Sequence, residues 1–543
     1  MKTILQYFYT IIHLRPIQIY YQIFYKIRSI FRKMIGFQYA QFIPAESIPI
    51  VLKPSISSNK SYFSSENRFC FLNQEQVFPI SQINWNNEQT FGKLWAYNLN
   101  YFDFLNQEDI SQSQGLALIR VYIYAYPTLK TGLEPYPTSL RGINWIKFLS
   151  KYQIQDAEID AFLMAQYVRL ADNLEYHLMG NHLLENAFSL LFGGVYFDNE
   201  TFLNLAKKIL KVELPEQILA DGCHFERSVM YHQIVLLRML DCLNLLQNNQ
   251  GKKLTELENE IVFYAQKMVG FLQKITFKNG DIPLMGDAAK NIAPTTYQLL
   301  EYANTLNIRV EKNELLESNY RKFEEGNFEL LVNLGTVSPD YLPAHSHCDI
   351  FNFVLYVDDK PFIVDTGIST YQNNERRHLE RSTMAHNTVQ IGDFEQSEIW
   401  GSFRVGRRAK VKILTDTENE IVASHDGFKR LGVFHQRSFR IENQRIIIKD
   451  TVLGKTDYPI KAYLHFHPDV ELQIMNDKII TNVGEIYVEN VTKIEQNDYH
   501  YSEEYNKLIS AKMVVLYFTN SISTIIYSTK NHENIDSNLL FSA

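Results

Sequence analysis

The stretch "NYRKFEEGNFEL" (residues 319–330) marks the point at which the sequence changes its period. Before it, apolar residues recur at every third or fourth position, as in "DAEIDAFLMAQYVRLADNLEYHLM" (residues 156–179). After it, short apolar runs are bounded by Gly, Asp and Asn, as in "FNFVLYV" (351–357) and "KPFIVDTG" (360–367). The first spacing indicates amphipathic helices and the second indicates strands. We therefore expect a helical half followed by a strand-rich half.

The helical pattern continues through "YHQIVLLRMLDCLNLLQ" (231–247) and "LTELENEIVFYAQKMVGFLQKI" (254–275). Short loops join these helices, which implies antiparallel hairpins, and a long series of hairpins can close into an α/α toroid. The many strands that follow fit a large antiparallel β-sandwich. We expect a basic and aromatic helical extension with a linker (1–90), an α/α toroid catalytic domain (91–322) and a β-sandwich domain (323–543).

The composition places the chain among ordinary globular proteins. Of its 543 residues, 45% are hydrophobic and 21% are charged, which is typical of soluble domains. The net charge of −8 argues against nucleic acid as a partner, although a local basic cleft can still bind an anionic substrate. The four cysteines lie far apart in the sequence, so neither a disulfide framework nor a thiolate zinc site is expected.

The N-terminus, "MKTILQYFYTIIHLRPIQIYYQIFYKIRSIFRKM" (1–34), is basic and aromatic and contains no acid. Its apolar run is interrupted by Gln6, Thr10 and His13, and no small-residue cleavage site follows. We therefore expect no signal peptide, and no later run is long enough to span a bilayer. Such a helix can lie on an anionic membrane surface as a peripheral contact, or it can pack on its own domain with a solvated basic face. Both interpretations remain open at this point.

Two segments of the helical half carry chemically capable side chains. In "MGNHLLENAF" (179–188), Asn181, His182 and Glu185 fall close together, with the histidine and the glutamate on one helix face. Such a group can grip a carboxylate and move a proton, or it can simply be a helix cap with a structural pair. In "ADGCHFERSVMYHQ" (220–233), Tyr231 heads a long helix. A neighbouring cation would lower its pKa and suit it to acid–base work; the alternative is a hydroxyl that merely finds a partner.

The strand-rich half carries a histidine cluster. His345 and His347 stand in "AHSHCDIFNF" (344–353), Asp365 ends the next apolar run, and His386 follows in "RSTMAHNTVQIGD". Two imidazoles and a carboxylate, with one position left for water, would suit zinc. The alternative is a satisfied polar seam within a sheet.

Read together, these segments resemble the heparinase II/III-like polysaccharide lyases, a superfamily that also contains alginate lyases. The resemblance covers most of residues 90 to 470, and its segments follow in order. They are "LWAYNLNYFDFL", "EPYPTSLRGINWIKF", "GNHLLEN", "DGCHFERSVMYHQ", "PLMGDAA", "AHSHCDIFNF", "VDTG", "AHNTV" and "SHDGFKR". The resemblance implies an incomplete α/α toroid followed by an antiparallel β-sandwich. It also implies β-elimination at a uronic acid in an anionic polysaccharide or oligosaccharide.

The resemblance assigns a role to each catalytic candidate. Asn181 would neutralise the C6 carboxylate of the uronate, and Glu185 would share a proton with it. Tyr231 would deliver a proton to the leaving oxygen and, for a suitable epimer, act as base. His182 would be the alternative base for the opposite C5 face. His345 would reach the cleft from the sandwich and orient the carboxylate or the tyrosine.

The resemblance also implies a structural divalent metal, most readily zinc, with no organic cofactor. Its ligands would be His347, Asp365 and His386. Of these, His386 is the least secure, because other histidines lie nearby in the sequence: His425, His465 and His467. Substrate contacts would come from four residues, each of which could equally make an internal contact: Arg141, Asn144, Arg227 and Arg381.

Two other functions remain open. A toroid glycoside hydrolase would need two carboxylates facing across the cleft, for which Asp221, Glu226 and Asp287 are candidates. A polysaccharide-binding or assembly protein would have lost its lyase chemistry. Secreted relatives usually carry a signal peptide, whereas this chain has the basic aromatic extension. We therefore expect a role in making or remodelling a bacterial surface polysaccharide, in the cytoplasm or at the inner membrane.

Overall fold

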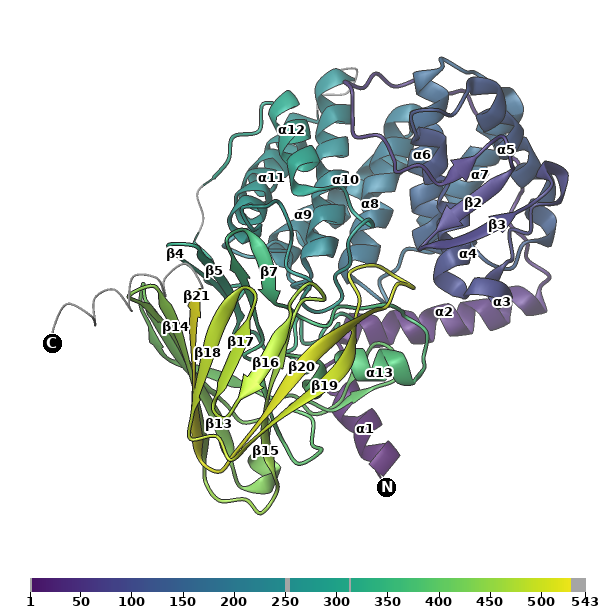
Figure 1. The fold of residues 1–543 in the computed structure, drawn as a ribbon. Helices are drawn as coiled ribbons and strands as arrows, with labels where there is room; N and C mark the ends of the chain where they lie inside the picture. Colours follow the sequence, from purple (N-terminus) through teal and green to yellow (C-terminus); the bar gives the residue numbers. More distant parts are fainter. Residues whose placement is uncertain (1, 250–253, 312–313, 529–543) are drawn as a thin grey trace, which may run out of the picture.

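The structure is a computed structural model that describes residues 2–249, 254–311 and 314–528. A helical half lies above a half made of antiparallel sheets in Figure 1. The helices of the first half are α3 (Glu88–Phe91), α4 (Lys93–Tyr101), α5 (Gln112–Ala125), α6 (Pro135–Lys151), α7 (Ala157–Asp172), α8 (Gly180–Tyr196), α9 (Glu200–Gln217), α10 (Val229–Asn248), α11 (Thr255–Ile275) and α12 (Thr296–Thr305).

Local sequence explains where these helices begin. Asp156 precedes α7 and its carboxylate accepts hydrogen bonds from the backbone amides of Glu158 and Ile159. Ser228 precedes α10, and its side chain accepts from the amide of Tyr231. Side chains of this kind satisfy the amides that a helix start leaves unpaired. The cap before α10 also places Tyr231 in the first turn of that helix.

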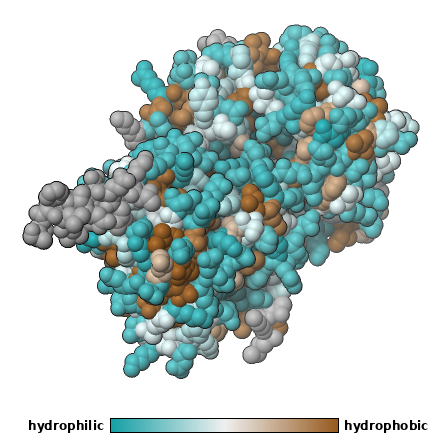
Figure 2. Space-filling model, in the orientation of Figure 1, coloured by the Kyte–Doolittle hydropathy of each residue, from teal (hydrophilic) through white to brown (hydrophobic). Residues whose placement is uncertain are grey.

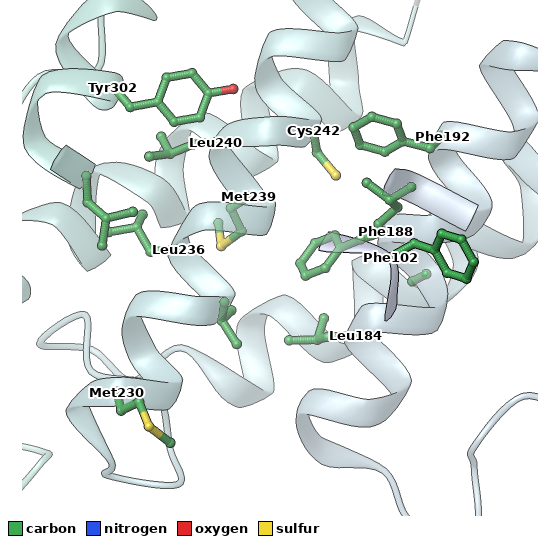
Figure 3. Packing of buried hydrophobic residues seen from close by; sticks show 14 of the residues in the cluster. Phe102, Leu184, Phe188, Phe192, Met230, Leu236, Met239, Leu240, Cys242 and Tyr302 are labelled. Atoms are coloured by element: carbon green, nitrogen blue, oxygen red, sulfur yellow. The ribbon is translucent and has the colours of Figure 1, made fainter. Parts of the chain in front are cut away.

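The inner helices of the first half are buried on nearly all sides. Almost every residue of α6, α8 and α10 is buried, as expected for the inner layer of a toroid. Figure 3 shows Leu184 and Phe188 of α8 on the side of α10 that carries Met239, within one hydrophobic cluster. This packing holds the starts of α8 and α10 in fixed positions, and both of these starts carry candidate catalytic residues.

The sheets of the second half are antiparallel throughout. An eight-stranded sheet has the order β11-β12-β13-β14-β21-β18-β17-β16, and two four-stranded sheets have the orders β19-β20-β15-β8 and β4-β5-β6-β7. Their strands are β4 (Tyr320–Glu325), β5 (Phe328–Asn333), β6 (Phe353–Val357), β7 (Lys360–Ile363), β8 (Val389–Ile391), β11 (Val411–Asp416), β12 (Glu420–His425), β13 (Phe434–Glu442), β14 (Arg445–Leu453), β15 (Ile460–His465), β16 (Leu472–Met475), β17 (Lys478–Thr481), β18 (Gly484–Glu489), β19 (Lys493–Tyr501), β20 (Ile509–Phe518) and β21 (Ser521–Ser528).

The sheets share one hydrophobic core. Phe439 of β13 lies opposite Ile448 of β14 in the eight-stranded sheet. Both belong to the same buried cluster as Leu516 of β20 and Leu355 of β6, from the four-stranded sheets. Alternate residues of β13 are buried, because side chains on a strand point to opposite faces. The sheets therefore pack face to face as a sandwich.

The predicted order of helices and then strands is confirmed. The last helix of the first half, α12, ends at Thr305, and β4 begins at Tyr320, inside the stretch where the period changes. The predicted boundary between residues 322 and 323 lies within β4. The predicted linker contains a small sheet that the sequence did not suggest, formed by β1 (Tyr62–Phe63), β2 (Arg68–Phe71) and β3 (Gln74–Val77).

Two helices at the N-terminus, α1 (Lys2–Ile11) and α2 (Pro16–Met34), lie outside both halves. Figure 1 shows α2 running beneath the toroid and α1 passing beside the sheets. Among the described residues, α10 is the helix that is long and apolar enough to cross a membrane, but 83% of its apolar window is buried inside the protein. We therefore assign α10 to the core.

Candidate active site

The site lies where the helical half meets the sheets, and its centre is a stacked pair of rings. Tyr231, in the first turn of α10, and His345, from the loop before β6, have ring centroids 4.0 Å apart with planes inclined by 28°. The Tyr231 hydroxyl lies 3.2 Å from that of Tyr371. The predicted catalytic tyrosine and the first histidine of "HSH" are therefore direct neighbours, although 114 residues separate them in the sequence (345 − 231).

Two carboxylates hold the His345 ring. Nδ1 of His345 lies 2.9 Å from Oδ2 of Asp287, and Nε2 lies 3.3 Å from Oε2 of Glu226. The side chain of His345 keeps 10% of its surface exposed. The ring is thus fixed at both nitrogens while one part of it still reaches solvent, which suits a residue that orients a partner.

Tyr231 retains its proton in this setting. Burial raises its pKa above the ordinary value, and the carboxylates of Asp287 and Glu226 act in the same direction. The guanidinium of Arg377 lowers the pKa of Tyr231, as does the hydrogen bond to Tyr371, but neither offsets burial. The neighbouring cation thus acts in the expected direction, but burial dominates and the net pKa of Tyr231 is raised. A tyrosine of this kind suits proton donation.

Asn181 stands at the start of α8 and is tied to Glu226. Its backbone amide and its Nδ2 each donate to the Glu226 carboxylate at 3.3 Å. The preceding residue, Gly180, has φ +58°, and a Cβ there would lie 2.7 Å from the Glu226 carboxylate and 2.3 Å from Leu342. The glycine therefore allows the close approach that places Asn181 beside Glu226 and His345. Burial raises the pKa of Glu226, although His345 acts against it.

His182 is the most exposed member of the catalytic set, with 38% of its side-chain surface accessible. Its Nδ1 lies 3.2 Å from Oε1 of Glu175, and its ring lies 4.5 Å from that of Tyr136. Burial opposes a charge on the imidazole, but Glu175 and two further glutamates raise its pKa above the ordinary value. His182 therefore presents a ring of increased basicity to the solvent-accessible side of the site.

Glu185 lies deeper, one helical turn beyond His182. Its Oε1 is 3.0 Å from Nε of Arg238, and the residue is 3% exposed. Burial raises the pKa of Glu185 to about 7, even though Arg238 lowers it. A carboxyl group with this pKa can hold or release a proton near neutral pH.

Asp287 connects the site to the sheets. Its two oxygens accept from both terminal nitrogens of Arg377, at 2.5 Å and 2.7 Å, and Oδ1 also lies 2.9 Å from Nε2 of His347. Burial would raise the pKa of Asp287, but Arg377 and the two histidines hold it well below its usual range. Asp287 is therefore an ionised hub that joins both histidines of "HSH".

Sequence reasoning missed several members of this site. Asp287 was considered only as a hydrolase acid, and Arg377 was not considered. Arg377 belongs to α13 (Glu375–Arg381), a short helix rich in charges in which no spacing distinguishes one arginine from another. Tyr371, Tyr136 and Glu175 carried no sequence signal either, because only the fold brings them to the site.

The structure argues against three of the predicted substrate contacts. Arg141 is 1% exposed and donates to the backbone oxygens of Asn100 and Gly132. Arg381 is 0% exposed and donates to backbone oxygens that include that of Ser346. Both guanidinium groups therefore stabilise loops inside the protein and do not face a cleft.

Asn144 is also buried, at 2% exposed, and donates to the backbone oxygen of Tyr101 and to Asp103. It therefore fixes the end of α4, and its assignment as a substrate contact is not supported. Arg227 differs, because it is only half-buried and one of its nitrogens donates to the backbone oxygen of Thr336 at 3.0 Å. Its substrate role stays a prediction.

The three predicted metal ligands lie together behind the site. Nδ1 of His386 is 2.8 Å from Oδ2 of Asp365, and the rings of His386 and His347 have centroids 5.4 Å apart. Nδ1 of His347 and Nε2 of His386 are buried and have no hydrogen-bond partner among the described residues. Two buried, unpaired imidazole nitrogens are what a metal would satisfy.

The fit to a metal is nevertheless partial. Within residues 2–249, 254–311 and 314–528, no group of three or more His, Cys, Asp or Glu has an arrangement that could hold a metal ion. The Asp365 carboxylate is occupied, because it accepts from His386, from Asn352 and from the amide of Gly367. Asp365 therefore orients His386 in this structure instead of standing free as a third ligand.

Comparison with known proteins gives consistent results for both halves of the chain. The family profile described as "Heparinase II/III N-terminus" matches residues 138–315, and the one described as "Heparinase II/III-like, C-terminal" matches residues 308–524. Among curated proteins, a heparin-sulfate lyase of Bacteroides thetaiotaomicron is 22% identical over 376 residues, which cover 61% of this chain and 51% of that protein. A heparin-sulfate lyase of Bacteroides stercoris is 24% identical over 315 residues, which cover 51% of this chain and 44% of that protein. The chain thus spans about half the length, or less, of these relatives.

Solved structures show the same fold. A crystal structure of heparinase III superposes with a TM-score of 0.67 at 16% identity, covering 82% of this chain and 79% of that one. A heparan sulfate lyase from Pedobacter heparinus superposes with a TM-score of 0.54 at 17% identity, covering 86% of this chain and 81% of that one. The expected incomplete α/α toroid followed by an antiparallel β-sandwich is confirmed.

Proposed function

The chain belongs to the heparinase II/III-like family, and we propose that it cleaves a uronate-containing polysaccharide by β-elimination. The observation that carries this proposal is the stacked Tyr231–His345 pair, with Asn181 and His182 at the adjoining start of α8. A protonated phenol, an amide donor and a basic imidazole are the groups that elimination at a uronate requires. The names of the relatives, which are heparin-sulfate lyases, make a glycosaminoglycan the first substrate to test.

The first step would reduce the charge on the C6 carboxylate. Asn181 would donate a hydrogen bond to this group, and Glu185, with a pKa of about 7, would share a proton with it. Because the C5–H bond is acidic only when the carboxylate charge is offset, these donors lower the barrier to proton removal. His345, fixed between Asp287 and Glu226, would keep the substrate and the Tyr231 ring in register.

The second step would involve two proton transfers. For one C5 epimer Tyr231, ionised at that moment, would take the C5 proton and then carry it to O4. In each case the electron pair of the C5–H bond forms the C4–C5 double bond, and the C4–O4 bond breaks. Tyr231 gives its proton to the departing O4, in keeping with a pKa raised by burial. For the opposite C5 epimer His182 would be the base, and the glutamates that raise its pKa strengthen the basicity of its neutral form.

Hydrolysis is the second candidate, and the arrangement of the acids disfavours it. Glu226 and Asp287 contact opposite nitrogens of His345, so the imidazole fills the space between them. Asp221 accepts from the backbone amides of Cys223, Leu316 and Ser318, which gives it a structural task. A glycosidase needs two carboxylates that face each other across a sugar.

A structural divalent cation is proposed for the rear of the site. The unpaired nitrogens of His347 and His386 support it, and zinc is the ion that best suits imidazole. Bound there, the cation would tie the "HSH" loop to the segment before β8. Elemental analysis of the purified protein should find one equivalent of metal that a chelator removes with a fall in melting temperature. Metal-free protein with an unchanged melting temperature would contradict the assignment.

The reaction itself can be tested with a panel of uronate polymers: heparan sulfate, chondroitin, hyaluronan and alginate. Elimination creates a conjugated C4–C5 double bond, so we expect ultraviolet absorbance to rise with at least one of them. New reducing ends without that absorbance would indicate hydrolysis, and no product from any polymer would indicate a binding protein. A role in making or remodelling a bacterial surface polysaccharide, in the cytoplasm or at the inner membrane, is likewise proposed. Full-length protein found free in the medium would contradict that location.

A further inference from the structure

The helix α2 packs on the protein through a side that carries polar and tyrosine residues. Its buried residue is Gln18, at 2% exposed, and the hydroxyl of Tyr25 donates to the backbone oxygen of Leu174 at 2.5 Å. Arg28 and Arg32 both pair with Asp172. These residues recur at the spacing of one helix face. A helix of a water-soluble protein ordinarily buries its apolar face, so α2 is reversed with respect to the protein beneath it.

The opposite side of α2 is apolar and exposed. Tyr20 is 60% exposed, Ile27 is 61% exposed and Met34 is 79% exposed, and these three lie seven residues apart, on one line along the helix. In Figure 2 hydrophilic residues cover most of the visible face; hydrophobic patches occur on both halves, and one lies at the underside of the helical half, where α2 runs in Figure 1. The exposed apolar residues of α2 are Ile17, Ile19, Tyr20, Ile23, Phe24, Ile27, Ile30, Phe31 and Met34.

The helix α1 continues this surface. Ile4, Phe8 and Ile11 are each more than half exposed. Tyr7 on the same helix is 47% exposed and packs edge-on against the ring of Trp400, whose Nε1 donates to Thr10 at 3.1 Å. α1 is therefore held against the sheets through Tyr7 and Thr10, while Ile4, Phe8 and Ile11 remain exposed. We call the exposed apolar residues of α1 and α2 the N-terminal apolar face.

Cations border the N-terminal apolar face. Lys26 and Lys33 are exposed on α2, and no acidic residue precedes Glu46 in the sequence. Arg404 and Arg407 are exposed next to α1, where Arg407 lies 4.7 Å from the centre of the Tyr9 ring. The charges along the border are thus mostly positive, with Asp340 near His13 as an acidic neighbour, although the chain as a whole has a net charge of −8.

These features select one occupant. A second copy of the chain would bring Lys26 and Lys33 towards the same cations, with no acid in either N-terminal segment to pair with them. An anionic bilayer offers both an apolar interior and negative headgroups. Four charges within α2, Lys26, Arg28, Arg32 and Lys33, are incompatible with crossing the hydrocarbon core, so the helix would lie in the plane of the interface.

We propose that the N-terminal apolar face docks this protein onto the surface of an anionic lipid bilayer. Docking would also bring the catalytic loops close to the membrane. The side-chain amide of Gln18 donates to the backbone oxygens of Leu178, at 3.3 Å, and of Tyr341, at 3.4 Å. Leu178 lies three residues before Asn181, and Tyr341 lies four residues before His345. Through Gln18, α2 therefore contacts the two segments that carry these site residues.

The test is sedimentation of the full chain with vesicles of phosphatidylcholine alone or mixed with phosphatidylglycerol. We expect binding to the mixed vesicles that weakens as salt rises. The double variant Ile27→Glu/Phe31→Glu should lower the partition coefficient by about tenfold or more per side chain. Lys26→Gln/Lys33→Gln should lower it by about fivefold per lysine at low salt. The matched control, Val212→Glu/Phe263→Glu, alters exposed apolar residues of α9 and α11 and should bind like the wild type.

Three results would overturn the proposal: no binding of the wild type to mixed vesicles, equal binding by the wild type and the Ile27→Glu/Phe31→Glu variant, or a dimer in analytical ultracentrifugation that this variant dissolves. The last result would make the face a contact between copies. Because the altered side chains are exposed, the melting temperature should stay unchanged in every variant. Lyase activity on a soluble oligosaccharide is measured separately, so failure of docking and failure of the proposed reaction remain distinguishable.

Discussion

His345 and His347 are separated by one residue and share one carboxylate, yet they occupy opposite environments. His345 is partly exposed, stacks on Tyr231 and touches Glu226. His347 has a fully buried side chain, and its Nδ1 has no partner among the described residues. A two-residue step out of the turn at His345 can thus separate a chemical front from a structural rear, which Asp287 joins. Substitutions at the front should therefore alter activity, and substitutions at the rear should alter stability.

Removing the shared carboxylate should impair both regions at once, so that stability and activity are lost together. In Asp287→Ala, Arg377 becomes a buried charge without its bidentate partner and both histidines lose a hydrogen bond. Loss of one member of a buried pair costs about 3–5 kcal/mol. We expect this loss in the free energy of unfolding together with loss of activity, measured by denaturant unfolding and product absorbance. A stable but inactive variant would show that Asp287 serves the front alone.

Changing only the rear should separate stability from activity. In His347→Gln, Asp287 loses one donor and the proposed metal loses a ligand, so unfolding should become easier by about 1–3 kcal/mol. The folded fraction should keep its turnover, because His345 and Tyr231 are unchanged. His345→Gln is the matched control, for which turnover should fall while the melting temperature stays close to that of the wild type. Equal effects in both variants would contradict the division between front and rear.

The contribution of the buried Glu185 to stability should depend on pH. The folded-state pKa of Glu185, about 7, exceeds its unfolded value of about 4.3. This raised pKa stabilises the fold fully below the unfolded pKa, and the stabilisation is lost as pH rises through about 7. The free energy of unfolding, obtained from thermal melts, should therefore fall between pH 5 and pH 8 in the wild type. The fall should exceed that of Glu185→Gln by on the order of 1 kcal/mol. Parallel curves would show that Arg238 keeps Glu185 ionised throughout.

The smallest expected effect concerns the second base. Because the pKa of His182 is raised above its ordinary value, its neutral form predominates only at a pH above that raised pKa. With the uronate epimer that uses His182, the rate should rise as pH passes through this pKa, by about tenfold per unit below it. His182→Gln should remove the rise and leave cleavage of the other epimer intact. Loss of both activities would instead assign His182 to carboxylate binding.

The site residues that lie within short sequence motifs could be predicted from the sequence. Asn181, His182 and Glu185 lie within one helix start, and Tyr231 heads another, so local spacing identified them. The change of period around residues 319–330 likewise predicted the fold. The pairing of Asp287 with Arg377 could not be predicted, because 90 residues separate the partners and only the fold joins them.

The errors have a physical cause as well. Arg141 and Arg381 were expected to contact substrate. The sequence does not reveal whether an arginine faces a cleft or, as these two do, donates to backbone oxygens inside the protein. The net pKa of Tyr231 is raised because burial, which no local pattern reveals, outweighs the lowering by the nearby cation. The reversed orientation of α2 was also hidden. The sequence showed an amphipathic helix, but not which side packs on the protein.

The central claim is that Tyr231 donates the proton that releases the leaving sugar. Its most direct test is the initial rate of double-bond formation by Tyr231→Phe, with the polymer on which the wild type is most active. The variant loses one hydroxyl and its contact with Tyr371, so the melting temperature should barely change. We expect a rate lower by about 10²–10⁴-fold. A rate within a few-fold of the wild type, from a folded variant, would contradict the central claim.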